Sequence, residues 1–251
     1  MEGEIVSRKK ITHRFRLILL GFILLLSVYL FLHSSIFNLT QIEVIGNDKV
    51  TSEEVIALSG FAPGMNIFGI DEVIVAKSIE VHPLVKSAVI ERKPPHTVMI
   101  NLTERQIWAI IPYNDIFLCI DDAGVCFDKL NYTPIDNDLI ITLDLLPERV
   151  VLGQAVSPQA IEMIKQVWQA LPANEQQMIS DIHYQSQDVA INIYTIKGTE
   201  IRFGNIERFD EKIKTFAQVI QMENDLEQQG TDKLEYVDIR YKGEPVVKTR
   251  S

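Results

Sequence analysis

The sequence predicts an α+β protein held by a single N-terminal transmembrane helix. Three observations lead to this prediction: an apolar run over residues 17–37, a strand-helix-helix-strand-strand pattern over residues 38–103, and a longer region of alternating apolar segments with two amphipathic helices. The chain has 251 residues, of which 47% are hydrophobic and 23% are charged. This composition excludes a wholly disordered or collagen-like chain, and the length allows one or two domains.

Charge is divided unevenly along the chain. Residues 1–16 carry five Lys and Arg against two Glu, a net charge of +3, so the total of −10 leaves −13 for the rest. The acidic total argues against nucleic acid as a partner, because phosphate binding needs a surface rich in Lys and Arg. The basic residues precede the apolar run, which predicts a cytoplasmic tail at residues 1–16 and an extracytoplasmic remainder.

Residues 17–37 contain no Asp, Glu, Lys or Arg. As a helix that rises about 1.5 Å per residue, this run reaches about 31 Å, close to the ~30 Å hydrocarbon core of a bilayer. A cleaved signal peptide would be shorter and would end in small residues, and a core helix would be amphipathic. We therefore expect an uncleaved anchor, with Tyr29 and His33 toward the outer interface.

Residues 38–103 predict a small domain in which two helices cover one face of a three-stranded sheet. The first strand alternates over residues 41–45 and ends at Gly46. Thr51, followed by Glu54, forms a capping-box pattern at the start of one helix, and Asp71 can cap the second. The remaining strands lie on either side of Pro94-Pro95, and their inward-facing sets are Val85, Ser87 and Val89, then Val98, Ile100 and Leu102.

Residues 104–241 predict a second domain, a mostly antiparallel sheet with two packed helices. One helix has Ser157 as N-cap and ends at Pro172. The other is marked by apolar residues at helical spacing: Ile206, Phe209, Ile213, Phe216 and Ile220. A hairpin is expected around Asp121-Asp122-Ala123-Gly124, and strands are expected near 107–111, 180–185, 188–196, 199–203, 234–241 and 245–248. Residues 242–251 complete the chain as the last strand and a C-terminal tail.

The sequence contains no motif for a catalytic nucleophile, a zinc helix, a phosphate-binding loop or a dinucleotide site. Its histidines at 82, 96 and 183 are far apart along the chain, whereas metal sites need several ligands at defined spacing. The acidic pairs Glu53-Glu54 and Asp121-Asp122 are explained by a helix first turn and by turn chemistry. We therefore expect no catalytic residues, no metal, no cofactor and no small-molecule substrate.

The two cysteines, Cys119 and Cys126, flank the expected hairpin turn and lie outside the cytoplasm in the expected topology. An oxidising compartment would permit a disulfide between them. Cysteine is also an ordinary small apolar residue of a buried strand, and closing so short a loop stabilises little. The sequence leaves both states open.

The C-terminal stretch is the candidate partner-binding edge, because an open sheet edge offers unpaired N–H and C=O groups to an extended segment. Tyr241 would be an aromatic anchor, Gly243 would allow close backbone approach, and Pro245 suits an edge or a turn. The residues predicted to take part are Tyr241, Lys242, Gly243, Val246 and Val247. The alternative is that Tyr241 and Val247 complete the domain core.

Two sets of residues resemble known families. A β-α-α-β-β segment that begins Ile42-Glu43-Val44-Ile45-Gly46-Asn47 directly after a single anchor resembles a POTRA domain. The stretches 117–128, 236–241 and 246–248 are similar to the FtsQ/DivIB cell-division proteins. This resemblance implies a POTRA domain at 38–103, a β domain at 104–241, and docking of the small coiled-coil proteins FtsB (DivIC) and FtsL on the C-terminal strand. It also implies a cell-membrane location at the division septum.

Three functions are compatible with these features. The first is a non-enzymatic divisome scaffold that links septal membrane proteins and supports septal peptidoglycan synthesis. The second is a POTRA-containing component of secretion or outer-membrane assembly, which predicts tandem modules or a following β-barrel. The third is a cell-wall hydrolase, which needs two carboxylates facing each other across a cleft. The basic tail, anchor, POTRA-like segment and β domain in this order favour the first.

Overall fold

The computed structural model describes residues 2–132, 138–229 and 233–250, and it divides into two compact units between Glu104 and Arg105. Ser251, the last residue of the predicted C-terminal segment, lies outside the described residues. The unit boundary falls one residue after the predicted domain boundary because the last strand of the first unit continues through Glu104.

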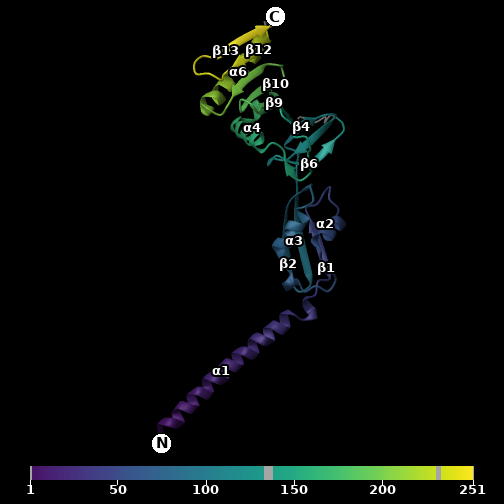
Figure 1. Ribbon diagram of the computed structural model, residues 1–251, viewed down its shortest axis with the longest axis vertical. Coiled ribbons are helices and arrows are strands. Elements are labelled where there is room, and N and C mark those ends of the chain that lie inside the picture. The colour runs from purple at the N-terminus through teal and green to yellow at the C-terminus, as the bar shows by residue number, and fades with distance from the viewer. Residues whose placement is uncertain (1, 133–137, 230–232, 251) are drawn as a thin grey trace. The chain divides into compact units, whose positions relative to one another are not determined.

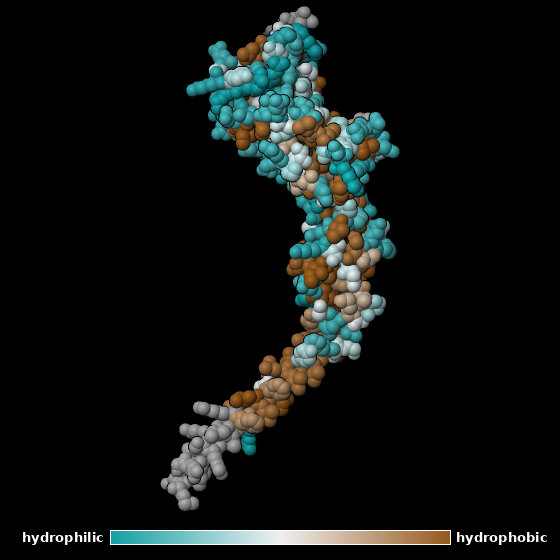
Figure 2. Space-filling view, viewed as in Figure 1, coloured by the Kyte–Doolittle hydropathy of each residue, from teal (hydrophilic) through white to brown (hydrophobic). Residues whose placement is uncertain are grey.

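Helix α1 (Glu2–Leu32) continues from the basic tail through the apolar run without interruption (Figure 1). Its segment Phe15–Leu32 is long and apolar enough to cross a membrane, none of it is buried, and it forms the brown band in Figure 2. The helix ends five residues before the predicted end of the span. Ser35–Phe37 instead forms a 3₁₀ turn, η1, and Phe37 is buried in the core of the next domain.

The first unit has the predicted β-α-α-β-β order. Strand β3 lies in the centre of a three-stranded sheet, parallel to β1 and antiparallel to β2. The helices contribute Val55, Val75 and Ile79 to the same apolar cluster as the sheet. The elements are β1 (Gln41–Ile45), α2 (Ser52–Ser59), the 3₁₀ turn η2 (Ile67–Gly69), α3 (Glu72–Ile79), β2 (Val85–Lys93) and β3 (Thr97–Glu104).

Both predicted helix starts are confirmed. The Thr51 side chain accepts a hydrogen bond from the backbone N–H of Glu54, whose carboxylate accepts one from the backbone N–H of Thr51, so the capping box is complete. The Asp71 carboxylate accepts from the backbone N–H groups of Val73 and Ile74. These caps satisfy N–H groups that a helix cannot satisfy internally.

The predicted inward face of β2 is wrong after its first residue. Val85 is buried, but a β-bulge between Val85 and Ser87 shifts the alternation, so that Ala88 and Ile90 face the core and Val89 is exposed. A bulge inserts one extra residue and thereby moves every later side chain to the opposite face. The set predicted for β3, Val98, Ile100 and Leu102, is buried as expected.

The second unit contains a ten-stranded sheet in the order β13-β12-β11-β10-β9-β7-β4-β5-β6-β8. Among the described strands, the parallel pairs are β4 with β7, β7 with β9, and β11 with β12, so the sheet is mostly antiparallel, as predicted. The strands are β4 (Ala109–Tyr113), β5 (Ile116–Ile120), β6 (Val125–Leu130), β7 (Leu139–Leu143), β8 (Gln154–Ala155), β9 (Ile179–Gln185), β10 (Ala190–Thr195), β11 (Glu200–Gly204), β12 (Lys233–Asp238) and β13 (Val246–Arg250).

Helices α4 (Pro158–Ala170) and α6 (Phe209–Gln229) pack into one apolar cluster with the strands, and a short helix, α5 (Ala173–Gln176), follows α4. Ser157 occupies the predicted cap position but makes no side-chain cap, because its backbone is left-handed with φ 43°. Ile206 precedes α6 and is exposed, and α6 extends nine residues beyond Ile220.

Candidate functional site

Strand β13 forms one end of the ten-stranded sheet and has β12 as its neighbour (Figure 1). All five of its residues are exposed. The opposite end of the sheet, β8, is only two residues long. The outer side of β13 therefore presents the longer row of backbone N–H and C=O groups for pairing with another strand.

The register of β13 places an apolar side chain on each of its faces. Val247 lies opposite Val237, which is fully buried, and Val246 lies opposite Asp238 on the other face of the sheet. Val246 is 58% exposed and Val247 is 40% exposed. A partner strand that pairs with β13 would cover both.

Two cationic side chains lie over the ring of Tyr236 beside this edge. The guanidinium carbon of Arg202 is 3.9 Å from the ring centroid, and the Nζ atom of Lys248 is 5.9 Å from it. Lys248 also donates a 2.8 Å hydrogen bond to Glu235, which raises the pKa of the Lys248 ammonium. Exposed pairs of this kind add little stability, but charge beside an edge strand opposes indiscriminate pairing and selects partners by electrostatic fit.

The loop between β12 and β13 is fixed at its start by Arg208, which precedes α6. The Nη2 atom of Arg208 donates to the carbonyl oxygens of Ile239 and Arg240, at 3.2 and 2.7 Å. Arg240 in turn donates to both carboxylate oxygens of Asp238, and these hydrogen bonds lower the pKa of Asp238. The loop therefore leaves the sheet in a defined direction.

Lys212, one helical turn after Arg208, lies buried where α6 begins. Its Nζ atom donates to the carbonyl oxygen of Asn205 at 2.7 Å and lies 5.1 Å from the ring centroid of Phe203. Burial lowers the pKa of this ammonium group. A small hollow between α6 and the loop is lined by Arg208, Glu211, Lys212, Thr215, Ile239, Tyr241, Gly243 and Pro245.

The structure brings the predicted partner-binding residues together on the β12–β13 hairpin. Tyr241, Lys242 and Gly243 lie in the loop, and Val246 and Val247 begin β13. Tyr241 is not in a strand as predicted, because β12 ends at Asp238. At 71% exposure, Tyr241 does not complete the core, and Val247 is partly exposed as well.

Sequence reasoning missed the residues that fix this hairpin. Arg208 and Arg202 reach it from other elements, so no local spacing in the sequence indicates their role, and Lys212 lines the hollow beside the same loop. The sequence predicts Tyr236 in the strand near 234–241, and it gives no sign that the ring receives two cations. Its position in β12 opposite Lys248 in β13 depends on the register shift between Leu234 and Tyr236.

The cysteines are not bonded to each other. Cys126 lies opposite Ile120 across the hairpin, and both belong to the main apolar cluster, whereas Cys119 lies opposite Asp128. Because successive residues of a strand point to opposite faces, Cys119 and Ile120 project to different sides of the sheet. The two sulfur atoms are thus on different faces, and burial raises the pKa of the Cys126 thiol.

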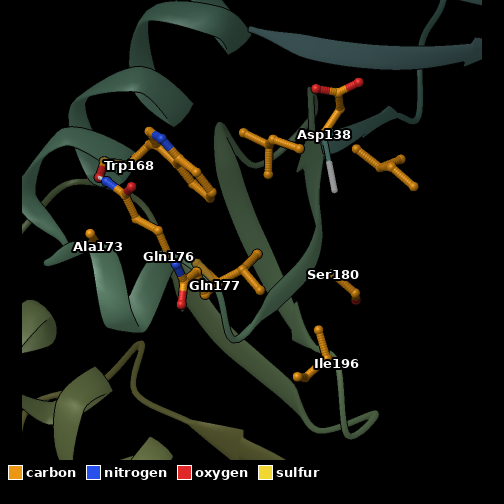
Figure 3. A pocket seen from close by; sticks show the side chains of 10 residues that line it. Asp138, Trp168, Ala173, Gln176, Gln177, Ser180 and Ile196 are labelled. Atoms are coloured by element: carbon orange, nitrogen blue, oxygen red, sulfur yellow. Dashed lines mark hydrogen bonds between the residues drawn. The ribbon is translucent and has the colours of Figure 1, made fainter. Parts of the chain in front are cut away.

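A separate hollow of about 470 Å³ lies between the α4–α5 region and β7 and β9 (Figure 3). Trp168 and Gln176 line one side, and Asp138, Ser180 and Ile196 line the other. The Gln176 amide donates to the carbonyl oxygens of Trp168 and Leu171, so it closes the end of α4. The described lining includes one carboxylate and no histidine or cysteine, which provides no pair for acid–base chemistry.

The histidines and acidic pairs considered from the sequence make structural contacts. His183 is 2.9 Å from the Thr142 hydroxyl, and the His82 ring accepts from the backbone N–H of Leu84. Asp121 accepts from the backbone N–H groups of Ala123 and Val125 in the hairpin turn. Within residues 2–132, 138–229 and 233–250, no three His, Cys, Asp or Glu side chains gather as a metal site would require.

Comparison with known families matches both units. The family model described as "POTRA domain, FtsQ-type" matches residues 37–105, and the model "Cell division protein FtsQ/DivIB, C-terminal" matches residues 109–240. The second match spans more than half of the chain and contains β12, Arg202, Arg208 and Asp238.

Individual proteins similar to this chain carry related names. The cell division protein FtsQ of Geobacter sp. (strain M21) is 27% identical over 86% of this chain and 77% of its own length. The cell division protein DivIB of Clostridium botulinum is 25% identical over 97% of this chain and 94% of its own length. Among solved structures, the major extracytoplasmic domain of DivIB from Geobacillus stearothermophilus has a TM-score of 0.31 and 17% identity, and it covers 48% of this chain and 97% of that chain. On the strength of the family matches, this chain belongs to the FtsQ/DivIB family of bacterial cell-division proteins.

Proposed function

We propose that this protein is a non-enzymatic scaffold of the divisome. In this proposal it links small bitopic coiled-coil division proteins, FtsB (DivIC) and FtsL, at the septal membrane and supports septal peptidoglycan synthesis. Its N-terminus lies in the cytoplasm, α1 spans the cell membrane, and both folded units lie outside. Membership of a cell-division family supports this role over secretion or outer-membrane assembly.

The observation that carries the proposal is the exposed edge strand β13 with its apolar and aromatic neighbours. A partner segment can add a strand to β13 through main-chain hydrogen bonds, which supply affinity. Tyr241, Val246 and Val247 supply apolar contact area, and Lys248 with Arg202 supplies charge that can select the partner. A rigid hairpin, held by Arg208, lowers the entropy that binding would otherwise cost.

Site-specific photocrosslinking in dividing cells tests the proposed edge. A benzoylphenylalanine in place of Tyr241 or Val246 is expected to capture a small bitopic coiled-coil protein. The matched control is Val189, which is 41% exposed in the turn between β9 and β10 of the same unit. Capture at 241 and 246 but not at 189 supports the proposal, and equal capture at all three positions contradicts it.

Localisation tests the cellular role independently of the edge. A fluorescent fusion of the full chain is expected at mid-cell during division, and depletion of the protein is expected to give filamentous cells. A fusion spread evenly over the membrane, in cells that divide normally after depletion, would refute the divisome role.

A further inference from the structure

A loop of the first domain is attached to the end of the membrane-spanning helix. The last carbonyl groups of a helix lack partners within it. In α1, the carbonyl oxygen of Leu32 accepts a 2.8 Å hydrogen bond from the Nδ2 atom of Asn66, which immediately precedes η2. Asn66 also forms an isolated β-bridge with Asn38, and Leu39 donates a 2.7 Å backbone hydrogen bond to Met65. The loop thus caps the helix and is tied to the chain leaving it.

A series of three aromatic rings in contact strengthens this attachment. The rings of Phe31 and Phe37 meet edge-on with centroids 5.2 Å apart, and those of Phe37 and Phe68 meet at 5.0 Å. Phe37 is buried in the core of the domain, so the contact runs from the last turn of α1 through Phe37 to η2. Edge-to-face pairs of this kind hold a specific geometry as well as burying apolar area.

Large apolar side chains remain exposed at this junction. Ile36 is 57%, Met65 is 37% and Phe68 is 39% exposed. Each comes from a segment bonded to, or directly following, the end of α1. On the helix itself, the exposed Tyr29 stacks on His33 with ring centroids 4.1 Å apart. Tyrosine is a residue that is enriched at the membrane–water interface.

The distance of these side chains from the end of α1 can be compared with the thickness of the interfacial layer of a bilayer. A bilayer of about 40–45 Å with a core of about 30 Å leaves an interfacial layer of about 5–7 Å on each side. Ile36 lies four residues beyond Leu32, which is about 8 Å at the ~2.0 Å rise per residue of a 3₁₀ turn, and the Asn66 side chain is hydrogen-bonded to the Leu32 carbonyl oxygen. Segments attached this closely to the end of a span lie in or next to the interfacial layer.

We propose that Ile36, Met65 and Phe68 form a membrane-contact surface that seats the POTRA domain at the headgroup–acyl boundary of the outer leaflet. The occupant is lipid, because Ile36, Met65 and Phe68 belong to segments that are bonded to, or directly follow, the end of the apolar helix. The domain is then held at the membrane by two attachments, the cap on α1 and the inserted side chains. These attachments restrict its orientation relative to the membrane. This inference rests on α1 spanning the bilayer and is independent of the partner-binding edge.

Depth-dependent fluorescence quenching tests the inference. The full chain carrying Met65→Cys is labelled with nitrobenzoxadiazole and reconstituted into vesicles of phosphatidylcholine and phosphatidylglycerol that contain spin-labelled phosphatidylcholine. Cys119 and Cys126 are fully buried, so the reagent is expected to react with the introduced cysteine at position 65 alone. We expect blue-shifted emission and quenching at least about half as strong as that of a label at Leu30→Cys within the span.

Val81→Cys is the matched control in the same domain. Val81 is highly exposed and apolar and lies just before β2, whose first residue Val85 pairs with Glu104. Glu104 is the last residue of β3, and Thr97 is the first, about 23 Å away along the strand. Thr97 pairs with Gln41, close to the anchor, so Val81 lies near the opposite end of the sheet. A label at position 81 is therefore expected to emit as in water and to resist quenching by the lipid.

A second set of variants separates lipid contact from simple proximity. In the Met65→Cys chain, Ile36→Ser with Phe68→Ser is expected to lower the quenching at position 65 while leaving that at position 30 unchanged. Strong quenching at 30 with none at 65 would overturn the inference and leave the membrane span intact. Absence of quenching at both positions would overturn the span and the inference together. Because only lipid and this chain are present, quenching at 65 cannot come from a protein partner.

Discussion

Gly46, where β1 ends, is a position at which two independent constraints require the absence of a side chain. Its backbone has φ +84°, a conformation that costs an L-residue about 1–2 kcal/mol. In addition, a Cβ atom at this position would overlap the carbonyl oxygen of Leu102 in the neighbouring strand β3. Glycine at position 46 is therefore required by the close packing of two backbones.

Gly46→Ala is expected to destabilise the first domain by more than about 2 kcal/mol, because strain and overlap add. Gly60→Ala is the matched control: its φ is +68°, but nothing lies within 4 Å of an added Cβ, so only the strain remains. Both tryptophans lie in the second unit, so the measurement is hydrogen exchange of amides in β1 and β3. Equal effects of the two substitutions would show that the overlap is relieved at no cost.

Glu104 is a buried carboxylate that holds a loop of the first domain. It accepts hydrogen bonds from the backbone N–H groups of Asp48, Lys49 and Val50, at 2.8 to 3.0 Å. Burial by itself would raise the pKa of Glu104, but the backbone donors outweigh it, and the pKa is lowered from 4.5. A carboxylate whose pKa is lowered by folding stabilises the folded state above its unfolded pKa, and this stability is lost as pH falls through the folded pKa.

Glu104→Gln is expected to cost about 1–3 kcal/mol at neutral pH, since one amide oxygen replaces a carboxylate and buried N–H donors lose their acceptor. The wild-type domain is expected to lose this stability as the pH falls below about 4.5, and the variant to lose less over the same range. Hydrogen exchange of residues 48–50 as a function of pH measures the loss of stability at neutral pH and the pH dependence of each protein. A variant with the same pH dependence as the wild type would assign the effect to another group.

At the scale of elements, the hairpin β12–β13 depends on a side chain from outside it. Arg208 donates to the carbonyl oxygens of Ile239 and Arg240, more than thirty residues away along the chain. We expect Arg208→Ala to weaken the local stability of β13 by about 1.4 kcal/mol, which is about tenfold faster hydrogen exchange over Val246–Arg250. Arg208 has φ 54°, and alanine bears the same backbone cost there, so the difference reports on the guanidinium contacts.

Lys214→Ala is the matched control for this prediction, because Lys214 is an exposed cation on α6. Its substitution is expected to leave exchange in β13 unchanged. If Arg208→Ala and Lys214→Ala accelerate exchange equally, the hairpin responds to net charge on α6 and not to the hydrogen bonds of Arg208.

Elements with local signals were predictable, and elements defined by distant partners were not. Thr51 with Glu54, and Asp71, mark helix starts by contacts three residues apart, and both caps form. The sequence predicts no strand at β7, because the segment reads Leu-Ile-Ile-Thr-Leu and the exposed Ile140 is apolar, which hides the alternation. The bulge in β2 and the early end of β12 depend on register with neighbouring strands. The sequence predicts the two strands of the hairpin, but not its support by Arg208, which comes from another element.

At the scale of the whole molecule, the apolar run and the charge pattern belong together. Leaving out residues 17–37 leaves a remainder with the composition of an ordinary soluble protein. The five cations of residues 1–16 precede the span, and the net charge of −13 follows it. The distribution of Lys and Arg determines which end of a span stays in the cytoplasm. The proposed partner-binding edge at β13 and the proposed outer-leaflet contact at Phe68 both depend on the outward orientation of everything after α1.

This orientation predicts opposite accessibility of the two ends of the chain. In intact cells, a membrane-impermeant maleimide is expected to label Lys242→Cys, in the exposed loop before β13, and not Ser7→Cys, in the basic tail. Cys119 and Cys126 are buried and should stay unlabelled in the folded protein. Permeabilised cells, in which both introduced cysteines should react, control for reactivity. Labelling of Ser7→Cys in intact cells would place the tail outside, and the edge strand would then face the cytoplasm, where an extracytoplasmic partner could not reach it.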